Sequence, residues 1–234
     1  MIGAYIAIIV GVVVWGVLLP VGRRFTEETM RSITVFGGAF LLGVCCLELL
    51  PEVAETFSSH RERMGYLPFV AILIGFLVQQ VLDGLSAHAE HGHTEEGFTL
   101  GGLMLGLCLH AFLEGMPLVW ESQVNQGLLW GIVVHNIPVA ILMVGLMASR
   151  GYRIGQVLAL LALFGVMSPL GSLCCRFVIQ PDAAWQGVVT GLVVGVLLHV
   201  SSSILFDHKR NRFSWLSVAL SVAAFVAAAL ICLH

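Results

Sequence analysis

Long apolar segments, nearly free of charged residues, recur along the whole chain and constrain its fold more than any other feature. Eight segments have the length of a membrane-spanning helix, since about 20 apolar residues cross a bilayer core roughly 30 Å thick. They are Ile2–Pro20, Ile33–Pro51, Tyr66–Leu82, Phe98–Val119, Leu128–Met147, Ile154–Phe177, Gly187–Phe206 and Trp215–Cys232. They are too long for the alternating strands of a membrane barrel. We therefore predict an all-α membrane protein with eight transmembrane helices.

Composition excludes several other classes of protein. Only 11% of the 234 residues are charged, against roughly 25% in a soluble domain. The net charge of −3 offers no basic patch for nucleic acid. All six cysteines lie inside apolar segments, which is not the pattern of a disulfide framework. We expect the lipid bilayer as a partner and no nucleic acid.

The basic residues predict the orientation in the membrane, because cytoplasmic loops carry most Lys and Arg. Three basic residues fall on one side of the predicted topology, namely Arg61, Arg63 and Arg176. The loops on the other side hold Arg23, Arg24, Arg31, Arg150, Arg153, Lys209, Arg210 and Arg212. Both termini are therefore predicted to face outside. Met1 is followed directly by apolar sequence without a basic region, which favours a first membrane helix over a cleaved signal peptide.

A single transmembrane domain, residues 1–234, is predicted. Helices one to three span about 2–84, helices four and five about 98–149, and helices six to eight about 153–233. The connection at 86–97 reads "SAHAEHGHTEEG" and places His88, His91 and His93 beside three glutamates. Such tracts capture divalent cations loosely. The alternative is a solvated loop that binds nothing.

Polar groups inside the predicted spans are the candidates for function, because an ionisable group at bilayer depth costs a few kcal/mol or more. His110 and Glu114 are four residues apart and share one helix face. His135 and Asn136 add an imidazole and an amide oxygen from the next helix. Nitrogen and carboxylate ligands together suit Zn²⁺, Fe²⁺ or Mn²⁺. Further candidates are Glu48, His199 and Asp207.

For other polar residues inside the spans, a purely structural role is an alternative to a role in cation binding. His199, Ser203 and Asp207 form a stripe on the seventh helix, either along a cation path or as interhelical hydrogen bonds. Pro117 and Pro138 each free a backbone carbonyl, either to face a cation or only to kink a helix. On the third helix, the spacing of Gln79, Gln80 and Asp83 specifies nothing sharper than packing or a pore wall.

These residues resemble the ZIP (Zrt/Irt-like) family of divalent metal transporters. "HAFLEG", beginning at His110, is similar to the family motif His-x-x-x-Glu-Gly, and "HNIPVA", beginning at His135, to His-x-x-Pro-Glu. "FGGAFLLGVCCLELLPE" and "GVLLHVSSSILFD" are similar to the second and seventh helices of the family. The resemblance implies a 3+2+3 bundle whose outer triplets are inverted repeats, with alternating access to a site near the bilayer midplane.

The chain departs from the family pattern at four positions. Val139 stands where the fifth helix has a second carboxylate, and Ala111 where a polar residue is common. Glu48 replaces a frequent histidine and Asp207 a usual glutamate. Two adjacent divalent ions need negative charge between them to offset their repulsion. We therefore expect one ion in the core, with Glu48 restoring some of the missing charge.

The resulting hypothesis is transport of a divalent cation into the cytoplasm, with zinc first and iron, manganese or cobalt as alternatives. The ion is the substrate, no catalytic cofactor is expected, and the protein is not expected to be an enzyme. A bacterial inner membrane is the expected location, and a homodimer is left open. Two alternatives remain. One is an intramembrane zinc hydrolase built from His110, His135, His199 and Asp207. The other is a degenerate family member that binds metal without transporting it.

Overall fold

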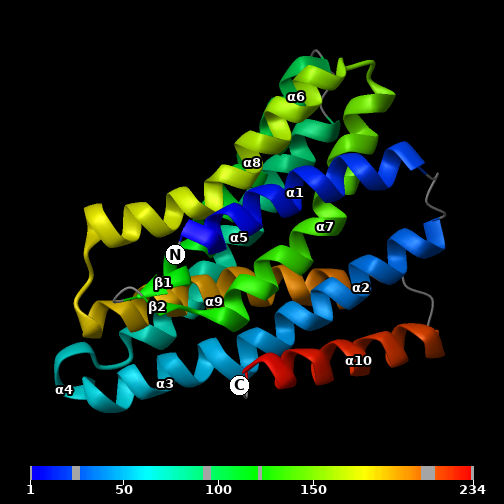
Figure 1. The fold of residues 1–234 in the computed structure, drawn as a ribbon. Coiled ribbons are helices and arrows are strands. Elements are labelled where there is room, and N and C mark those ends of the chain that lie inside the picture. The colour runs from blue at the N-terminus through cyan, green and yellow to red at the C-terminus, as the bar shows by residue number, and fades with distance from the viewer. Residues whose placement is uncertain (1, 23–26, 92–95, 121–122, 207–213, 233–234) are drawn as a thin grey trace.

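The fold is almost entirely helical, as the computed structural model shows for residues 2–22, 27–91, 96–120, 123–206 and 214–232 (Figure 1). Its helices are α1 Ile2–Gly22, α2 Glu27–Val44, α3 Leu50–Ser59, α4 Arg61–Met64, α5 Leu67–His91, α6 Glu96–Gly115, α7 Gln126–Ser149, α8 Ile154–Cys174, α9 Ala183–Phe206 and α10 Trp215–Cys232. A short antiparallel ribbon joins α6 to α7, with Val119–Trp120 (β1) paired to Gln123–Val124 (β2). Apart from this ribbon, the predicted all-α membrane fold is confirmed.

Within the described residues, seven helical stretches are long and apolar enough to cross a membrane. They are Glu28–Ser59, Leu67–Gly84, Gly101–Leu118, Gln126–Ala148, Ile154–Ile179, Ala183–Phe206 and Trp215–Cys232. In α1 the apolar stretch found in this way is shorter, Ile2–Val14. An eighth span and the 3+2+3 repeat therefore stay predictions.

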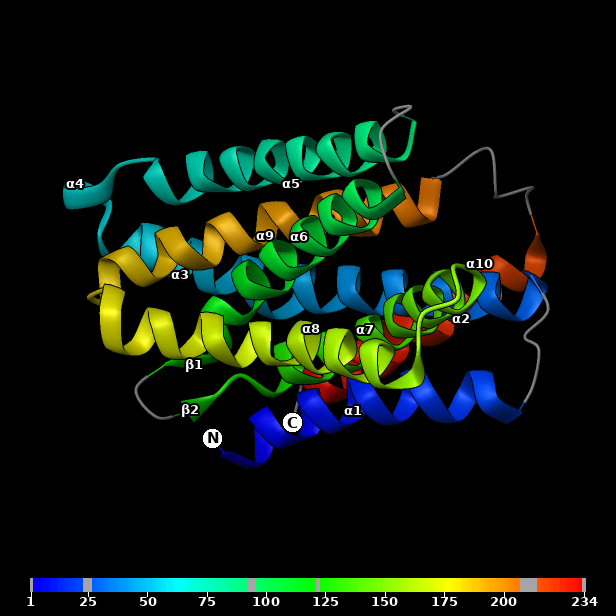
Figure 2. The same ribbon diagram turned by 90° about the horizontal axis from the view of Figure 1, so that it is seen from above.

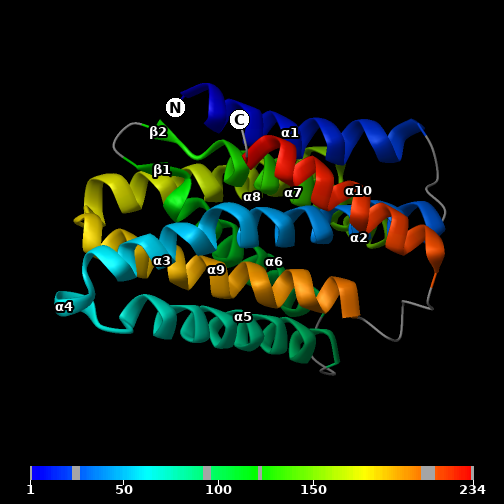
Figure 3. The same cartoon turned by 90° about the horizontal axis from the view of Figure 1, so that it is seen from below.

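The long helices form one bundle in which neighbours in space are often distant in sequence (Figures 2 and 3). α5 packs along α9, α10 along α2, α6 against α8, and α1 against α7 and α8. The ribbon, α4 and the start of α1 lie towards one end of the bundle. The C-terminal ends of α1, α5 and α9 lie towards the other end (Figure 2). We call these the ribbon end and the opposite end.

Glycines bring the backbones of α5 and α9 into direct contact. A Cβ atom at Gly75 would collide with the carbonyl oxygen of Leu192, and one at Gly195 with that of Ile72. In lipid, where apolar surface gives little driving force between helices, such close approach supplies much of the attraction. The two helices are therefore held at a fixed separation and register.

The second membrane segment continues beyond Pro51, where the sequence predicted its end. A π-helical turn, Cys45–Leu49, joins α2 directly to α3, which runs to Ser59. Pro51 falls in the first turn of α3, directly after the π turn, so its missing backbone N–H lies where the regular α-helical pattern is already interrupted. The wider π turn accommodates the proline and lets the helix continue.

The expected loop at 86–97 is also largely helical. α5 extends to His91 and α6 begins at Glu96. The segment after the apolar run contains alanine and glutamate and no proline, and these residues continue a helix readily. Hydropathy indicated where the apolar span ends, and the helix continues beyond that point.

We predict that Gly75→Ala lowers the stability of the protein, because the added methyl group must push α5 away from α9. Overpacking of this kind costs about 1–3 kcal/mol. Gly84→Ala on the same helix is the matched control, since a Cβ there meets no atom within 4 Å. Thermal melting in detergent measures both. Equal melting temperatures for the two variants would contradict the close contact.

Candidate metal centre

Three polar side chains from α6 and α7 meet in the middle of the bundle. His110 and Glu114 lie on one face of the last turns of α6, with His110 Nε2 3.3 Å from Glu114 Oε2. His135 projects from α7, and its ring meets that of His110 edge to face at a centroid distance of 5.8 Å. Each residue offers one ligand atom, and these atoms lie within 4.8 Å of one another. Among the described residues, no other His, Cys, Asp and Glu side chains form such a group.

Burial makes this group unusual. Glu114 is 0% exposed, and neither of its carboxylate oxygens has a hydrogen-bond partner among the described residues. His110 Nε2 and His135 Nδ1 are likewise buried without one. The approach of His110 to Glu114 therefore lacks hydrogen-bond geometry despite its short distance. An unpaired buried carboxylate costs several kcal/mol unless a cation or a proton neutralises it.

The end of α6 is fixed by its contact with α8. A Cβ atom at Gly115 would collide with the carbonyl oxygen of Ser168, and one at Gly171 with that of Phe112. Glycine beside Glu114 thus allows two backbones to touch and fixes the height of the carboxylate in the bundle. The helix then ends in a 3₁₀ turn, Met116–Leu118. Pro117 lies in this turn, so it ends α6 and does not kink it.

α7 carries His135 about two and a half turns after a capped start. At its start, the side chain of Asn125 accepts a hydrogen bond of 2.7 Å from the backbone N–H of Leu128 and caps the helix. Pro138 lies inside the helix, as predicted from its place in an apolar run. Asn136 is buried, and within the part of the chain that the structure describes its Oδ1 has no hydrogen-bond partner. This amide oxygen is a further unsatisfied acceptor, from the residue next to His135.

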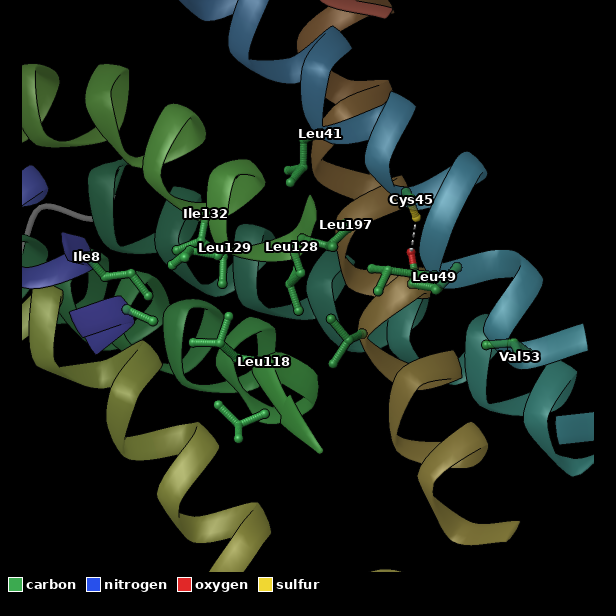
Figure 4. Close-up of a cluster of buried hydrophobic side chains, with 14 residues drawn as sticks. Ile8, Leu41, Cys45, Leu49, Val53, Leu118, Leu128, Leu129, Ile132 and Leu197 are labelled. Carbon is green, nitrogen blue, oxygen red and sulfur yellow. Dashed lines mark hydrogen bonds between the residues drawn. The ribbon is translucent and has the colours of Figure 1, made fainter. Parts of the chain in front are cut away.

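Apolar side chains surround the group on both sides. Ala111 and Val139 pack into a cluster that also contains Cys108, Met104 and Met143. One turn after His135, α7 therefore presents the apolar Val139 and no second carboxylate. A second cluster faces the ribbon end. It includes Ile8, Leu41, Cys45, Leu49, Val53, Leu118, Leu128, Leu129, Ile132 and Leu197 (Figure 4). Because Leu118 follows Glu114 by one turn and Ile132 precedes His135 by one turn, apolar side chains close the group off from the ribbon.

A cavity of about 730 Å³ opens on the opposite end of the bundle. Its polar lining comes mainly from the start of α2 and the end of α9, namely Arg31, Thr34, His199, Ser202 and Ser203. The two ends of the bundle thus differ: one is filled with apolar side chains and the other is hollowed and partly polar.

Glu48 does not join the group in the structure. It lies in the π turn after α2, where its Oε2 is 3.3 Å from Cys232 Sγ, which donates a hydrogen bond to it. A Cβ atom at Gly127 would collide with the same oxygen, which places Glu48 beside the start of α7. Gly127 precedes His135 by eight residues, about 12 Å along a helix. The expectation that Glu48 adds charge to the centre therefore lacks geometric support.

His199 also lies apart from the group. Its Nδ1 is 3.3 Å from Asp83 Oδ2 of α5, and its ring packs edge to face on Phe76. Asp207 and His93 lie outside the described residues. His88 and His91 belong to the last turns of α5, but their side chains are not described, so the loop-capture interpretation stays a prediction.

Gln79 is a participant that the sequence did not single out. Its Oε1 lies 3.0 Å from His110 Nδ1, and its Nε2 donates a hydrogen bond of 2.8 Å to Asp83 Oδ1. The available signal was the spacing of Gln79 and Asp83, four residues apart and therefore on one face of a membrane helix. That spacing indicates a shared face but not the helix it meets.

The fold and the centre together define a helical membrane protein with a buried group of side chains of the kind that can hold a cation. No protein-family model matches the chain. The chain is 22% identical to zinc transporters ZIP9-B and ZIP9-A of Xenopus laevis and ZIP9 of Xenopus tropicalis. Each match extends over 209 residues and covers 72% of this chain and 69% of the relative. The likeness supports divalent metal transport as the general class of function.

We predict that Glu114→Gln weakens Zn²⁺ binding by more than about tenfold, since even the loss of an outer-shell contact costs 10–100-fold. The rise in melting temperature on adding Zn²⁺ should disappear as well. Without metal the variant should be no less stable than the natural protein, because it no longer buries an unpaired carboxylate. Glu55→Gln on α3, at an exposed position, is the matched control. Calorimetric titration and melting with and without Zn²⁺ measure these effects, and natural affinity in Glu114→Gln would contradict them.

Proposed function

We propose that the chain is a transporter of the ZIP (Zrt/Irt-like) family that moves a divalent metal cation, with Zn²⁺ as the first candidate. In this proposal His110, Glu114 and His135 hold the ion halfway across the membrane. The observation that supports it most directly is Glu114, buried beside two imidazoles and without a hydrogen-bond donor among the described residues. A divalent cation satisfies all of these acceptors at once.

The ligand chemistry fits a transported ion. Two imidazole nitrogens and one carboxylate form a three-ligand set, which leaves a position open on a tetrahedral ion. Asn136 Oδ1 or water can complete it. Iron, manganese and cobalt accept the same donors, so zinc is favoured by the named relatives rather than by the ligands. An ion with one coordination position not filled by a charged or imidazole ligand is also easier to release, as transport requires.

The two ends of the bundle support alternating access with the ion leaving at the opposite end. Apolar side chains close the ribbon end, while the cavity beside Arg31 and His199 is open. In this proposal the open end faces the cytoplasm, because most Lys and Arg residues of the predicted loops lie on that side. Because the lining of this cavity includes none of His110, Glu114 and His135, the ion is enclosed in this conformation, and in the proposal the cavity marks the end at which it leaves, with both termini outside. His88, His91 and His93 are proposed as a loose capture site at the same end.

Of the alternatives, the intramembrane hydrolase has the weaker geometry. It needs a histidine or carboxylate from α9 to converge on His110 and His135, whereas His199 pairs with Asp83. A family member that binds metal without moving it has the same centre as a transporter. Zinc uptake by purified protein in sealed vesicles separates these functions. Uptake that is lost in Glu114→Gln and kept in Glu55→Gln supports transport; zinc binding without uptake contradicts it.

We predict that the natural protein binds one tight ion in the core and that Val139→Glu increases this capacity. Residue 139 lies one turn after His135 on the same helix, so a glutamate there brings a second carboxylate towards α6. The variant should bind a second ion, or the first one more tightly. Without metal it should be destabilised, since a buried carboxylate costs several kcal/mol in the membrane.

Calorimetric titration and metal-dependent melting test Val139→Glu, with Val139→Leu as the control for added size. A variant indifferent to metal, or two tight core ions in the natural protein, would contradict the role assigned to Val139.

A further inference from the structure

Gln79 connects the proposed metal centre to a second polar pair on another helix. It is 4% exposed although it belongs to a membrane-spanning stretch of α5. One end of its amide meets His110 Nδ1 at 3.0 Å, and the other end meets Asp83 Oδ1 at 2.8 Å. Both ends of the side chain are thus engaged, which fixes its position between α5 and α6.

The hydrogen-bonding capacity of Asp83, Gln79 and His110 determines which group donates and which accepts in each contact. The side chain of Asp83 is 49% exposed, and its carboxylate accepts hydrogen bonds and donates none. The amide of Gln79 must therefore turn its NH₂ group to Asp83 and its oxygen to His110. An amide oxygen only accepts, so the proton of the neutral His110 ring lies on Nδ1.

The other ring nitrogen of His110 then carries a lone pair. This nitrogen, Nε2, is the atom that faces Glu114 Oε2 at 3.3 Å without a hydrogen bond. Two acceptors facing each other repel unless a cation lies between them. The orientation of Gln79 therefore accounts for the unsatisfied state of Nε2.

We propose that Gln79 and Asp83 are positioning residues that hold His110 in the Nδ1–H tautomer and so present Nε2 to the ion. The link to metal rests on the proposed function; the tautomer does not. A histidine that binds a metal commonly donates its other N–H to a carbonyl or carboxylate, and losing that partner costs about 10–100-fold in affinity. The amide oxygen of Gln79 occupies the position of that carbonyl partner, beside His110 Nδ1.

Asp83 also lies close to α9. His199 Nδ1 of α9 is 3.3 Å from Asp83 Oδ2, without hydrogen-bond geometry, so the carboxylate lies between Gln79 and His199 and is hydrogen-bonded to Gln79. The glycine contacts of Gly75 and Gly195 fix α5 against α9 one to two turns away. The position of Gln79 thus depends on α9 as well as on α5, and α9 influences the centre without supplying a ligand to it.

The tautomer is measured by nitrogen NMR of protein labelled with ¹⁵N-histidine, without metal, with the His110 signal assigned by its loss in His110→Asn. We expect the Nδ1–H form in the natural protein and the Nε2–H form, or a mixture, in Gln79→Leu and Asp83→Ala. Gln79→Glu should retain the Nδ1–H form, because a carboxylate still accepts from that nitrogen. Gln80→Leu is the matched control, since Gln80 is next to Gln79 in the sequence but its own side chain is exposed.

Calorimetric titration with Zn²⁺ measures the consequence. Gln79→Leu should bind about 10–100-fold more weakly and Gln80→Leu as tightly as the natural protein. An Nε2–H form of His110 in the natural protein, or an unchanged tautomer and affinity in both Gln79→Leu and Asp83→Ala, overturns the inference. Failure of the natural protein to bind Zn²⁺ contradicts the proposed function, while the metal-free NMR spectra still decide the tautomer.

Discussion

A carboxylate enclosed in the membrane bundle, Glu114, sets the main physical requirement of this structure. It is fully buried, and no side chain or backbone group of the described residues donates a hydrogen bond to it. The free-energy cost of such a group is several kcal/mol, and a neutral imidazole contributes only acceptor or donor character, without a compensating charge. A cation held between Glu114, His110 and His135 removes this cost. The same cost makes the occupied and empty states differ in energy, which a transport cycle can use.

Backbone contacts hold the ligands in place. Gly115 and Gly171 let α6 touch α8 directly beside Glu114, and Gly75 and Gly195 do the same for α5 and α9. Two helix pairs are therefore closely packed on either side of the centre. Gln79 links the two pairs, because a series of side-chain contacts runs from α9 through Asp83 and Gln79 to His110. The centre thus depends on helices that give it no ligand.

Much of this organisation was predictable from local sequence. The apolar segments identified the protein class, and the last of them coincides with α10. His110 and Glu114 are one turn apart, and His135 lies on the next span, so their proximity follows from helical periodicity and a short connection.

Relations between distant helices were less accessible. Glu48 fell on a membrane helix, but the π turn and its hydrogen bond from Cys232 place it beside the start of α7. The partner of His110 is 31 residues away on α5, and sequence spacing carries no signal for such a contact. Hydropathy likewise gave no sign that α5 continues to His91, because it reports lipid contact rather than helix propensity.

The most direct test of the central claim is the anomalous scattering from crystals of the natural protein grown with Zn²⁺ or Cd²⁺. We predict one strong core peak within coordination distance of His110 Nε2, the Glu114 carboxylate and the His135 ring, about 2.0–2.2 Å for Zn²⁺. The absence of a peak at these side chains, or a core ion bound elsewhere in the bundle, would contradict the assignment of this buried group as the metal centre.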